Sequence, residues 1–259
     1  MCVSKRLPAT FQAGSLLLLF LITTIAPSLI AGRSEPVVWV WSGAVTSESA
    51  VVKTKIRSDV SEVRLVLSPE SDFGQFTTYP EKGFAKSDSN GIASFSLRNL
   101  TADTLYYYVV ETDGQRGLRG RFQTFSDGPM SFTIGFASCA TTGSNHQIWK
   151  TIQDQNPLFF LHMGDFHYEN IKKNDPALYR RAFDRCLTSP RQGALYRHTP
   201  IAYIWDDHDF GPNDADGTTP GKPAALKTYQ QYVPHYPLRS EKGEVGSIQQ
   251  AFTVGRVRF

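Results

Sequence analysis

Residues that can bind metal ions or transfer protons follow three separate apolar segments of this 259-residue chain. The first segment ends at Cys139, the second at Asp165, and the third runs into DDHD, from Asp206 to Asp209. Such a concentration of carboxylates raises the free energy of the ionised state unless cations lie nearby. In open α/β sheets, ligands bind beyond the carboxyl ends of the strands, so we expect the three segment ends to form one site.

The second segment ends in GDFHYEN, from Gly164 to Asn170. Tyr168 lies three residues after Asp165 and reaches the same site if the chain begins a helical turn there. A carboxylate and a phenolate are hard oxygen donors that suit a highly charged cation. Structural alternatives remain for both motifs: a helix-capping Asp beside a packed Tyr here, and a solvated acidic loop for DDHD.

The elements that must position these residues alternate between apolar runs and helical stretches. We expect strands in Ser131–Ser138, Pro157–Asp165 and Thr199–Asp207, and helices in His146–Gln155, Ala177–Tyr196 (broken at Ser189–Pro190) and Ala224–Val233. This pattern predicts a buried sheet covered by helices. His162 lies inside an apolar run, and we expect it to be a core residue with satisfied hydrogen bonds.

Residues 36–128 have a different pattern, with short strand-like segments separated by turn residues. The expected strands are Val37–Gly43, Ala50–Ile56, Glu62–Ser68, Gly91–Leu97, Leu105–Thr112 and Gly120–Phe125. We therefore predict an all-β sandwich there. The segment LRNLTADTLYYYVV resembles part of a fibronectin type III domain, in which Leu100 and Tyr106 or Tyr108 would make the corner packing. No candidate catalytic cluster occurs in this region.

The N-terminus has the pattern of a signal peptide over residues 1–32. Lys5 and Arg6 precede the apolar run Ser15–Ile25, and Ala31 and Gly32 offer a cleavage region. We expect a secreted, periplasmic or cell-surface protein, with an uncleaved N-terminal anchor as the alternative, and no other segment that could span a membrane. The formal net charge is only +3 and no basic stripe is present, which argues against a nucleic-acid-binding surface.

Two cysteines remain once Cys2 is removed with the signal peptide. In an exported protein, Cys139 and Cys186 would by default form a disulfide. Cys139, however, ends an apolar strand beside the expected site, whereas Cys186 lies in the helical stretch YRRAFDRCL. We predict that Cys139 is a metal ligand and Cys186 a free buried thiol, with the disulfide as the alternative.

Four motifs together resemble the PhoD-like alkaline phosphatases, a branch of the calcineurin-like metallophosphoesterases. They are, in order, SFTIGFASC, FFLHMGDFHYEN, PIAYIWDDHDFGPND and TYQQYVPHYPL. The resemblance implies a metallophosphoesterase domain (an αββα sandwich) over residues 130–259, preceded by the β-sandwich at 36–128. The chain ends inside VGRVRF, which has a strand-like pattern, so we expect this domain to be incomplete.

The resemblance also implies roles for individual residues. Cys139 and Tyr168 match the pair that holds a ferric ion, and Asp165 matches the aspartate that bridges two metals. Asp207 stands where the wider superfamily has a metal-binding asparagine, and His208 matches the histidine that protonates the leaving group. The family's other metals are calcium ions, and other divalent metals remain possible. Further candidates for the metal sites or their surroundings are Asp206, Asp209 and Asn213.

The function that follows is hydrolysis of phosphate monoesters or diesters by a metal-activated hydroxide. The alternative is a secreted, non-catalytic binding protein with a degenerate phosphatase domain. We expect a monomer whose partner is a phosphate-ester substrate.

Overall fold

The computed structural model describes residues 35–60, 62–241 and 244–259 of the chain. Residues Glu35–Phe259 form one compact unit. The predicted signal peptide, residues 1–32, lies outside the described residues. Within the described ranges, no helix is long and apolar enough to cross a membrane.

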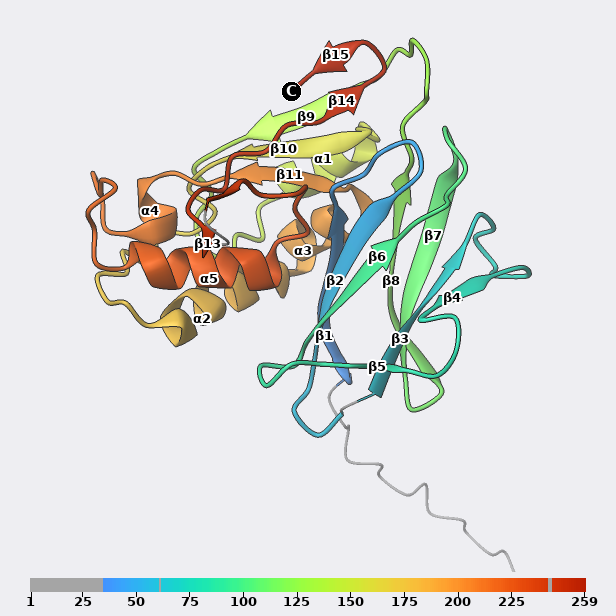
Figure 1. Cartoon of the computed structure of the whole chain (residues 1–259), viewed down its shortest axis with the longest axis horizontal. Helices are drawn as coiled ribbons and strands as arrows, with labels where there is room; N and C mark the ends of the chain where they lie inside the picture. Colours follow the sequence, from blue (N-terminus) through green and yellow to red (C-terminus); the bar gives the residue numbers. More distant parts are fainter. Residues whose placement is uncertain (1–34, 61, 242–243) are drawn as a thin grey trace, which may run out of the picture. The chain divides into compact units, whose positions relative to one another are not determined.

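The N-terminal part of this unit consists of two antiparallel sheets (Figure 1). The two sheets share an apolar core. One sheet has the strand order β6-β2-β1, and the other has the order β4-β3-β7-β8 with β5 on β3. Alternating side chains of both sheets, such as Val52, Leu65 and Val110, meet in this core. The strands are β1 (Val37–Gly43), β2 (Ala50–Ile56), β3 (Glu62–Ser68), β4 (Thr77–Tyr79), β5 (Ala85–Lys86), β6 (Ile92–Leu97), β7 (Leu105–Thr112) and β8 (Gln115–Gln123).

The following part alternates strands with helices, as the sequence predicts. Its three long apolar runs form the parallel strands β9 (Ile134–Ala137), β10 (Phe159–Met163) and β11 (Ile201–Ile204). The helices are α1 (Ile148–Asp154), α2 (Pro176–Leu187), α3 (Pro190–His198), α4 (Asp207–Phe210) and α5 (Lys222–Tyr232). The break between α2 and α3 falls at Ser189, because Pro190 has no amide proton and starts a new helix at its first position.

The two parts share one six-stranded sheet of order β6-β2-β1-β11-β10-β9. Strand β1 joins β11 in parallel at a single registered pair, Gly43 and Ile201. A Cβ atom on Gly43 would lie 2.4 Å from the carbonyl oxygen of Pro234 and 2.5 Å from that of Ile201, so only glycine fits this junction. The division into domains at 36–128 and 130–259 stays a prediction.

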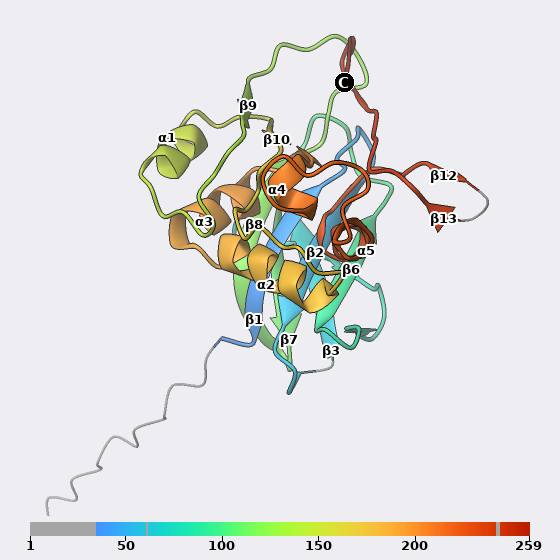
Figure 2. The ribbon, with the colours of Figure 1, turned by 90° about the vertical axis from the view of Figure 1, so that its left-hand side faces the viewer.

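Strand β1 is buried on both faces. Val40 points into the core between the two antiparallel sheets, whereas Trp39 and Trp41 point into a second core with α2, α3 and α5. Figure 2 shows α2 crossing in front of β1. The indole Nε1 of Trp41 donates to the carbonyl oxygen of Tyr232, 3.0 Å away, at the end of α5. The double burial explains why VVWVWSG is apolar without alternation.

The last segment forms two short hairpins, which no pattern in the sequence predicts. They are β12 (Ser240–Glu241) with β13 (Glu244–Val245) and β14 (Thr253–Val254) with β15 (Val257–Arg258). The VGRVRF segment is therefore part of a hairpin with its turn at Gly255, whose φ of 56° glycine adopts without strain.

Candidate metal centre

Three loops that carry the predicted site residues meet at the carboxyl edge of β9, β10 and β11. The amide of Cys139 donates to the carbonyl oxygen of Gly164 at 3.2 Å, which joins the loops after β9 and β10. Gly164 also lies against the loop after β11, because a Cβ atom on it would be 2.5 Å from the Cβ of Asp206. Cys139 (φ 62°) and Asp165 (φ 54°) both have left-handed backbone conformations. Such strain is typical of functional sites.

Asp165 lies at the centre of this arrangement. Its Oδ2 accepts a hydrogen bond from the phenol of Tyr168 at 2.8 Å and lies 3.4 Å from the Sγ of Cys139. Its Oδ1 is buried and has no hydrogen-bond partner among the described residues. A buried carboxylate oxygen without a partner raises the free energy of the fold unless a cation or a donor is added. The arrangement therefore fits a bound cation at Asp165.

The short helix α4 brings Asp207 and His208 to the same place. One ligand atom from each of Asp165, Asp207 and His208 lies within 4.8 Å of the others. The carboxylate of Asp207 accepts hydrogen bonds from the backbone amides of His208, at 2.9 Å, and of Asp214. These bonds hold its oxygens in place, so the two predicted carboxylate ligands come together in the structure.

His208 is held by packing. It is 7% exposed, and its ring centroid lies 4.2 Å from that of Tyr168. Its Nδ1 is buried and has no partner among the described residues. The imidazole is thus beside the carboxylates and the phenol, where it could either act on a substrate or bind a metal itself.

The surroundings of Tyr168 raise the pKa of its phenol. Its hydrogen bond with Cys139 is the largest cause, followed by burial and by the carboxylate of Asp165. These neighbours favour the protonated phenol, so a phenolate at this position needs a cation to balance its charge. The amide of Tyr168 donates to the hydroxyl of Thr142 at 2.8 Å. Thr142 belongs to no motif in the sequence, so its contact with Tyr168 could not be predicted before the fold was known.

Asp209 is buried and connects two of the loops. Its buried carboxylate accepts hydrogen bonds from the amides of Phe166, at 2.7 Å, and Asp206, at 2.9 Å. The side chain of Asp206 in turn accepts from the backbone amide of Asp209, which completes a capping box at the start of α4, and it also accepts from the amide of Asp207 at 3.0 Å. Burial raises the pKa of Asp209 to about 7, although its hydrogen bonds oppose the shift.

The structure does not bring the further candidates into the cluster of Asp165, Asp207 and His208. Asp206 and Asp209 serve the capping box, and the side chain of Asn213 donates to Asp214 at 2.6 Å. Their roles as ligands stay predictions.

Both remaining cysteines are free thiols in the structure. Cys139 is exposed, whereas Cys186 is fully buried and its Sγ donates to the carbonyl oxygen of Phe166 at 3.1 Å. Burial raises the pKa of the Cys186 thiol to about 12. The prediction of a free, buried Cys186 is confirmed.

The expectation for His162 was wrong in one respect. The residue is 1% exposed and belongs to the core, but neither ring nitrogen has a hydrogen-bond partner among the described residues. Its ring packs against the aromatic rings of Phe166 and Tyr203, which offer no acceptor to its nitrogens. Burial lowers the pKa of His162 to about 3, so the imidazole is neutral.

Comparison with known proteins confirms the resemblance stated above. Residues 134–258 match the sequence model of the PhoD-like phosphatases. No curated protein matches the chain in sequence. Among solved structures, one described as the structure of PhoD has a TM-score of 0.68 and 21% identity, covering 86% of this chain and 51% of its own. The purple acid phosphatase PPD1 from yellow lupin (Lupinus luteus) seeds has a TM-score of 0.58 and 12% identity, covering 86% of this chain and 44% of its own.

These likenesses show the fold, which is that of a metallophosphoesterase-like α/β domain. The chain spans about half the length of the two solved structures, at 51% and 44%.

Proposed function

We propose that this chain takes part in metal-dependent hydrolysis of phosphate esters at the cluster around Asp165. The observation that carries the proposal is the convergence of Asp165, Asp207 and His208 within 4.8 Å, inside the region that matches the PhoD-like phosphatases. Tyr168 and Cys139 complete a set of oxygen and sulfur donors around the same carboxylate.

In this proposal, Asp165, Asp207, Tyr168 and Cys139 hold the metal ions. Bound metal ions lower the pKa of water and stabilise the negative charge that develops on the phosphoryl oxygens. By resemblance, the metals are Fe³⁺ at Cys139 and Tyr168, and Ca²⁺. Thiolate and phenolate donors are compatible with iron.

His208 acts as the general acid. Its imidazole donates a proton to the departing alkoxide of the substrate, and packing against Tyr168 orients the ring. Asp209 keeps the loops of Asp165 and His208 together through its two backbone hydrogen bonds. The proposed substrates are both phosphate monoesters and phosphate diesters. The proposal also includes a fibronectin type III-like fold for residues 36–128 and an exported, monomeric protein.

The test is hydrolysis by the purified chain after incubation with Fe³⁺ and Ca²⁺. We expect turnover of 4-nitrophenyl phosphate, of bis(4-nitrophenyl) phosphate, or of both, and loss of turnover with a chelator. Asp165→Asn should lower the rate and the metal affinity by more than about 100-fold, because it removes the central ligand rather than a surrounding residue. Asp127→Asn, which changes an exposed acid, is the matched control.

The iron assignment has its own readout. A charge-transfer band in the visible spectrum should weaken in Cys139→Ser and in Tyr168→Phe. Metal binding without hydrolysis of either ester would favour the alternative of a non-catalytic binding protein. A chain that binds no metal would refute the proposal.

A further inference from the structure

A cavity of about 640 Å³ lies between residues 169–173 and helix α2. Four basic side chains line it, from Lys172, Lys173, Arg181 and Arg185, together with a single carboxylate, from Glu169. A concave surface that carries mostly one sign of charge concentrates ligands of the opposite sign. The cavity is therefore suited to an anion.

Most of this positive charge is not neutralised by the protein. Arg185 donates to Glu169, with Nη1 and Oε1 2.6 Å apart, so these two charges balance. In the described part of the chain, no ion pair or hydrogen bond involves the side chains of Lys172, Lys173 or Arg181. All three are exposed to solvent and can approach a ligand without loss of an existing partner.

The cavity adjoins the candidate metal centre. Glu169 follows Tyr168 directly, and a Cβ atom on Gly143, in the loop of Cys139, would lie 3.1 Å from the backbone oxygen of Arg185. Lys173, which also lines the cavity, is five residues after Tyr168. Five residues of chain span at most about 18 Å, so the Cα atoms of Tyr168 and Lys173 are no farther apart than that.

Apolar side chains lie between these cations. Ile171 is buried and Leu178 partly buried, and both line the cavity. A ligand with an alkyl segment and a terminal anion would contact both kinds of surface. Phosphate suits this place because lysine and arginine form charge-assisted hydrogen bonds with its oxygens.

We propose that the cavity binds a second phosphate group, carried by the alcohol part of the substrate, so that the preferred substrates are phosphate esters with a further phosphate. The proposal rests on the proposed function. The simpler interpretation is that these residues form a solvated basic surface. Such a surface attracts all anions and gives a second phosphate no specific binding site in the cavity.

The kinetic test compares hexane-1,6-diol bisphosphate with hexane-1,6-diol monophosphate. Both have the same alkyl chain and the same leaving-group chemistry. We expect a KM about tenfold lower for the bisphosphate, with similar kcat, because one charge-assisted hydrogen bond contributes about that much. Lys172→Ala combined with Lys173→Ala should raise the KM of the bisphosphate to that of the monophosphate, and Arg181→Ala should raise it in part.

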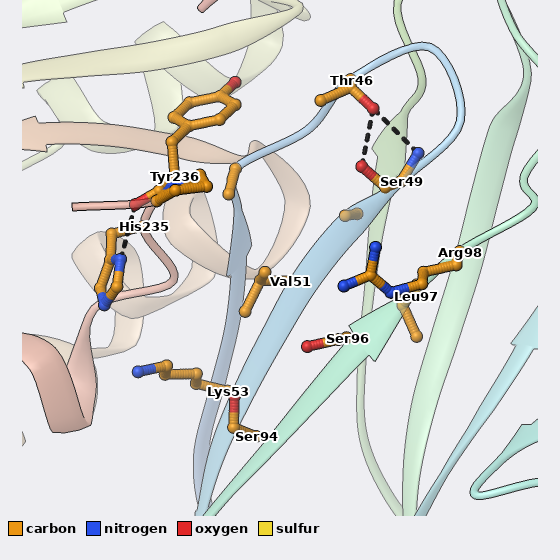
Figure 3. A pocket seen from close by; sticks show the side chains of 13 residues that line it. Thr46, Ser49, Val51, Lys53, Ser94, Ser96, Leu97, Arg98, His235 and Tyr236 are labelled. Atoms are coloured by element: carbon orange, nitrogen blue, oxygen red, sulfur yellow. Dashed lines mark hydrogen bonds between the residues drawn. The ribbon is translucent and has the colours of Figure 1, made fainter. Parts of the chain in front are cut away.

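Arg98→Ala is the matched control. Arg98 is exposed and lines a different cavity, of about 440 Å³, with Lys53 and His235 (Figure 3). It lies at the end of β6, in the N-terminal part of the unit. Its loss changes the net charge as much as Arg181→Ala does and should leave both KM values unchanged. An equal rise in KM with Arg98→Ala would show general electrostatic attraction and overturn the proposal.

A binding measurement separates this proposal from the proposed function. Calorimetry with hexane-1,6-diyl bisphosphonate and hexylphosphonate measures affinity without hydrolysis. Tighter binding of the bisphosphonate that is lost in the double lysine variant supports the cavity, even if neither ester is hydrolysed. Equal affinities, or affinities that the lysine and Arg181 substitutions do not change, overturn it, whether or not the monophosphate is hydrolysed.

Discussion

His208 differs from the carboxylates around it because its ring packs against a phenol and is largely withdrawn from solvent. The ring is 7% exposed and lies 4.2 Å from the ring of Tyr168. A side chain held in this way keeps one orientation without a hydrogen bond at Nδ1. Such a position is compatible with a general acid, whose proton must be presented at a fixed place.

We predict that His208→Ala slows hydrolysis most for esters of alcohols that leave poorly. For an alkyl phosphate, the loss of the acid should lower kcat by about 10²- to 10⁴-fold. The loss should be smaller for 4-nitrophenyl phosphate, because nitrophenolate scarcely needs a proton to leave. Steady-state kinetics on both substrates measures the difference.

Metal analysis of the same variant separates an acid from a ligand. His208→Ala should keep its metal ions, and His146→Ala, which removes an exposed imidazole, should behave as the parent chain does. Equal losses of rate on both substrates, or loss of the metals, would contradict the assignment of His208 as the acid.

At the scale of elements, the junction of β1 and β11 connects the N-terminal sheet to the strands that carry the site. The junction depends on Gly43, where the backbone approaches Pro234 and Ile201 more closely than a side chain permits. Strand β11 leads directly to Asp206 and Asp207, so a shift of this strand moves the ligands with it. The N-terminal sheet therefore helps to position the site although it contributes no ligand.

Gly43→Ala should destabilise the fold. Its Cβ would lie 2.4 Å from one carbonyl oxygen and 2.5 Å from another, and the backbone must move to relieve the overlap. We expect a loss of about 1–3 kcal/mol in the free energy of unfolding, the range for overpacking of a close-packed interior. Urea denaturation measures it.

Gly128→Ala is the control, because no atom lies within 4 Å of a Cβ at that position. It should change the free energy of unfolding by no more than about 0.5 kcal/mol. Similar losses in the two variants would show that the junction tolerates a methyl group.

The sequence predicted the elements well where one local pattern decides the structure. Strands β1, β2 and β3 have the expected bounds, and the apolar runs ending at Ser138, Asp165 and Asp207 contain β9, β10 and β11. Local patterns say nothing of partners, so the pairing of β1 with β11 was not foreseen. Strand β8 starts at Gln115, not at Gly120, because it pairs with β7 directly after the Asp113–Gly114 turn. The sequence did not predict this start, since Arg116 and Arg119 lack the apolar character of a strand.

The same limit applies to the site. Residue type and position at strand ends were enough to bring Asp165, Asp207 and His208 into one prediction, and the structure places them together. The direction of a side chain within a short helix depends on the helix cap. DDHD alone therefore could not show that the Asp209 carboxylate is buried and accepts from the amides of Phe166 and Asp206. Cys139 belongs to the same prediction by its position at a strand end, and the family resemblance adds its role in holding a ferric ion. In the structure its Sγ lies 3.4 Å from Oδ2 of Asp165.

At the scale of the whole molecule, buried neutral histidines make stability depend on pH. Burial lowers the pKa of His162 to about 3 and that of His167 to about 4, and for both residues burial is the largest cause. Between these values and the ordinary value of 6.5, the unfolded chain binds protons that the folded chain does not. The free energy of unfolding must therefore fall as the pH falls through this window.

We predict that His162→Leu weakens the pH dependence of the free energy of unfolding, because unfolding of the variant takes up one proton fewer. From about pH 6.5 to about pH 4, His162 alone should lower the free energy of unfolding by about 3 kcal/mol, since each pH unit contributes about 1.4 kcal/mol per proton. Leucine has no ring nitrogens to protonate and suits the aromatic surroundings of Phe166 and Tyr203, so the variant should keep its fold at neutral pH. Urea denaturation at about pH 7, 5.5 and 4 gives the slope for each chain.

The slope, rather than the stability at one pH, distinguishes this effect from ordinary repacking. A change of packing shifts the free energy of unfolding by the same amount at every pH, whereas loss of a titrating group changes its dependence on pH. The slope of His162→Leu should be smaller than that of the parent chain by about one proton, and the part due to His167 should remain. His146→Gln, at an exposed position, should reproduce the parent slope. Parallel curves for His162→Leu and the parent chain would mean that His162 takes up a proton within the folded structure, and its burial among aromatic rings would then not keep it neutral.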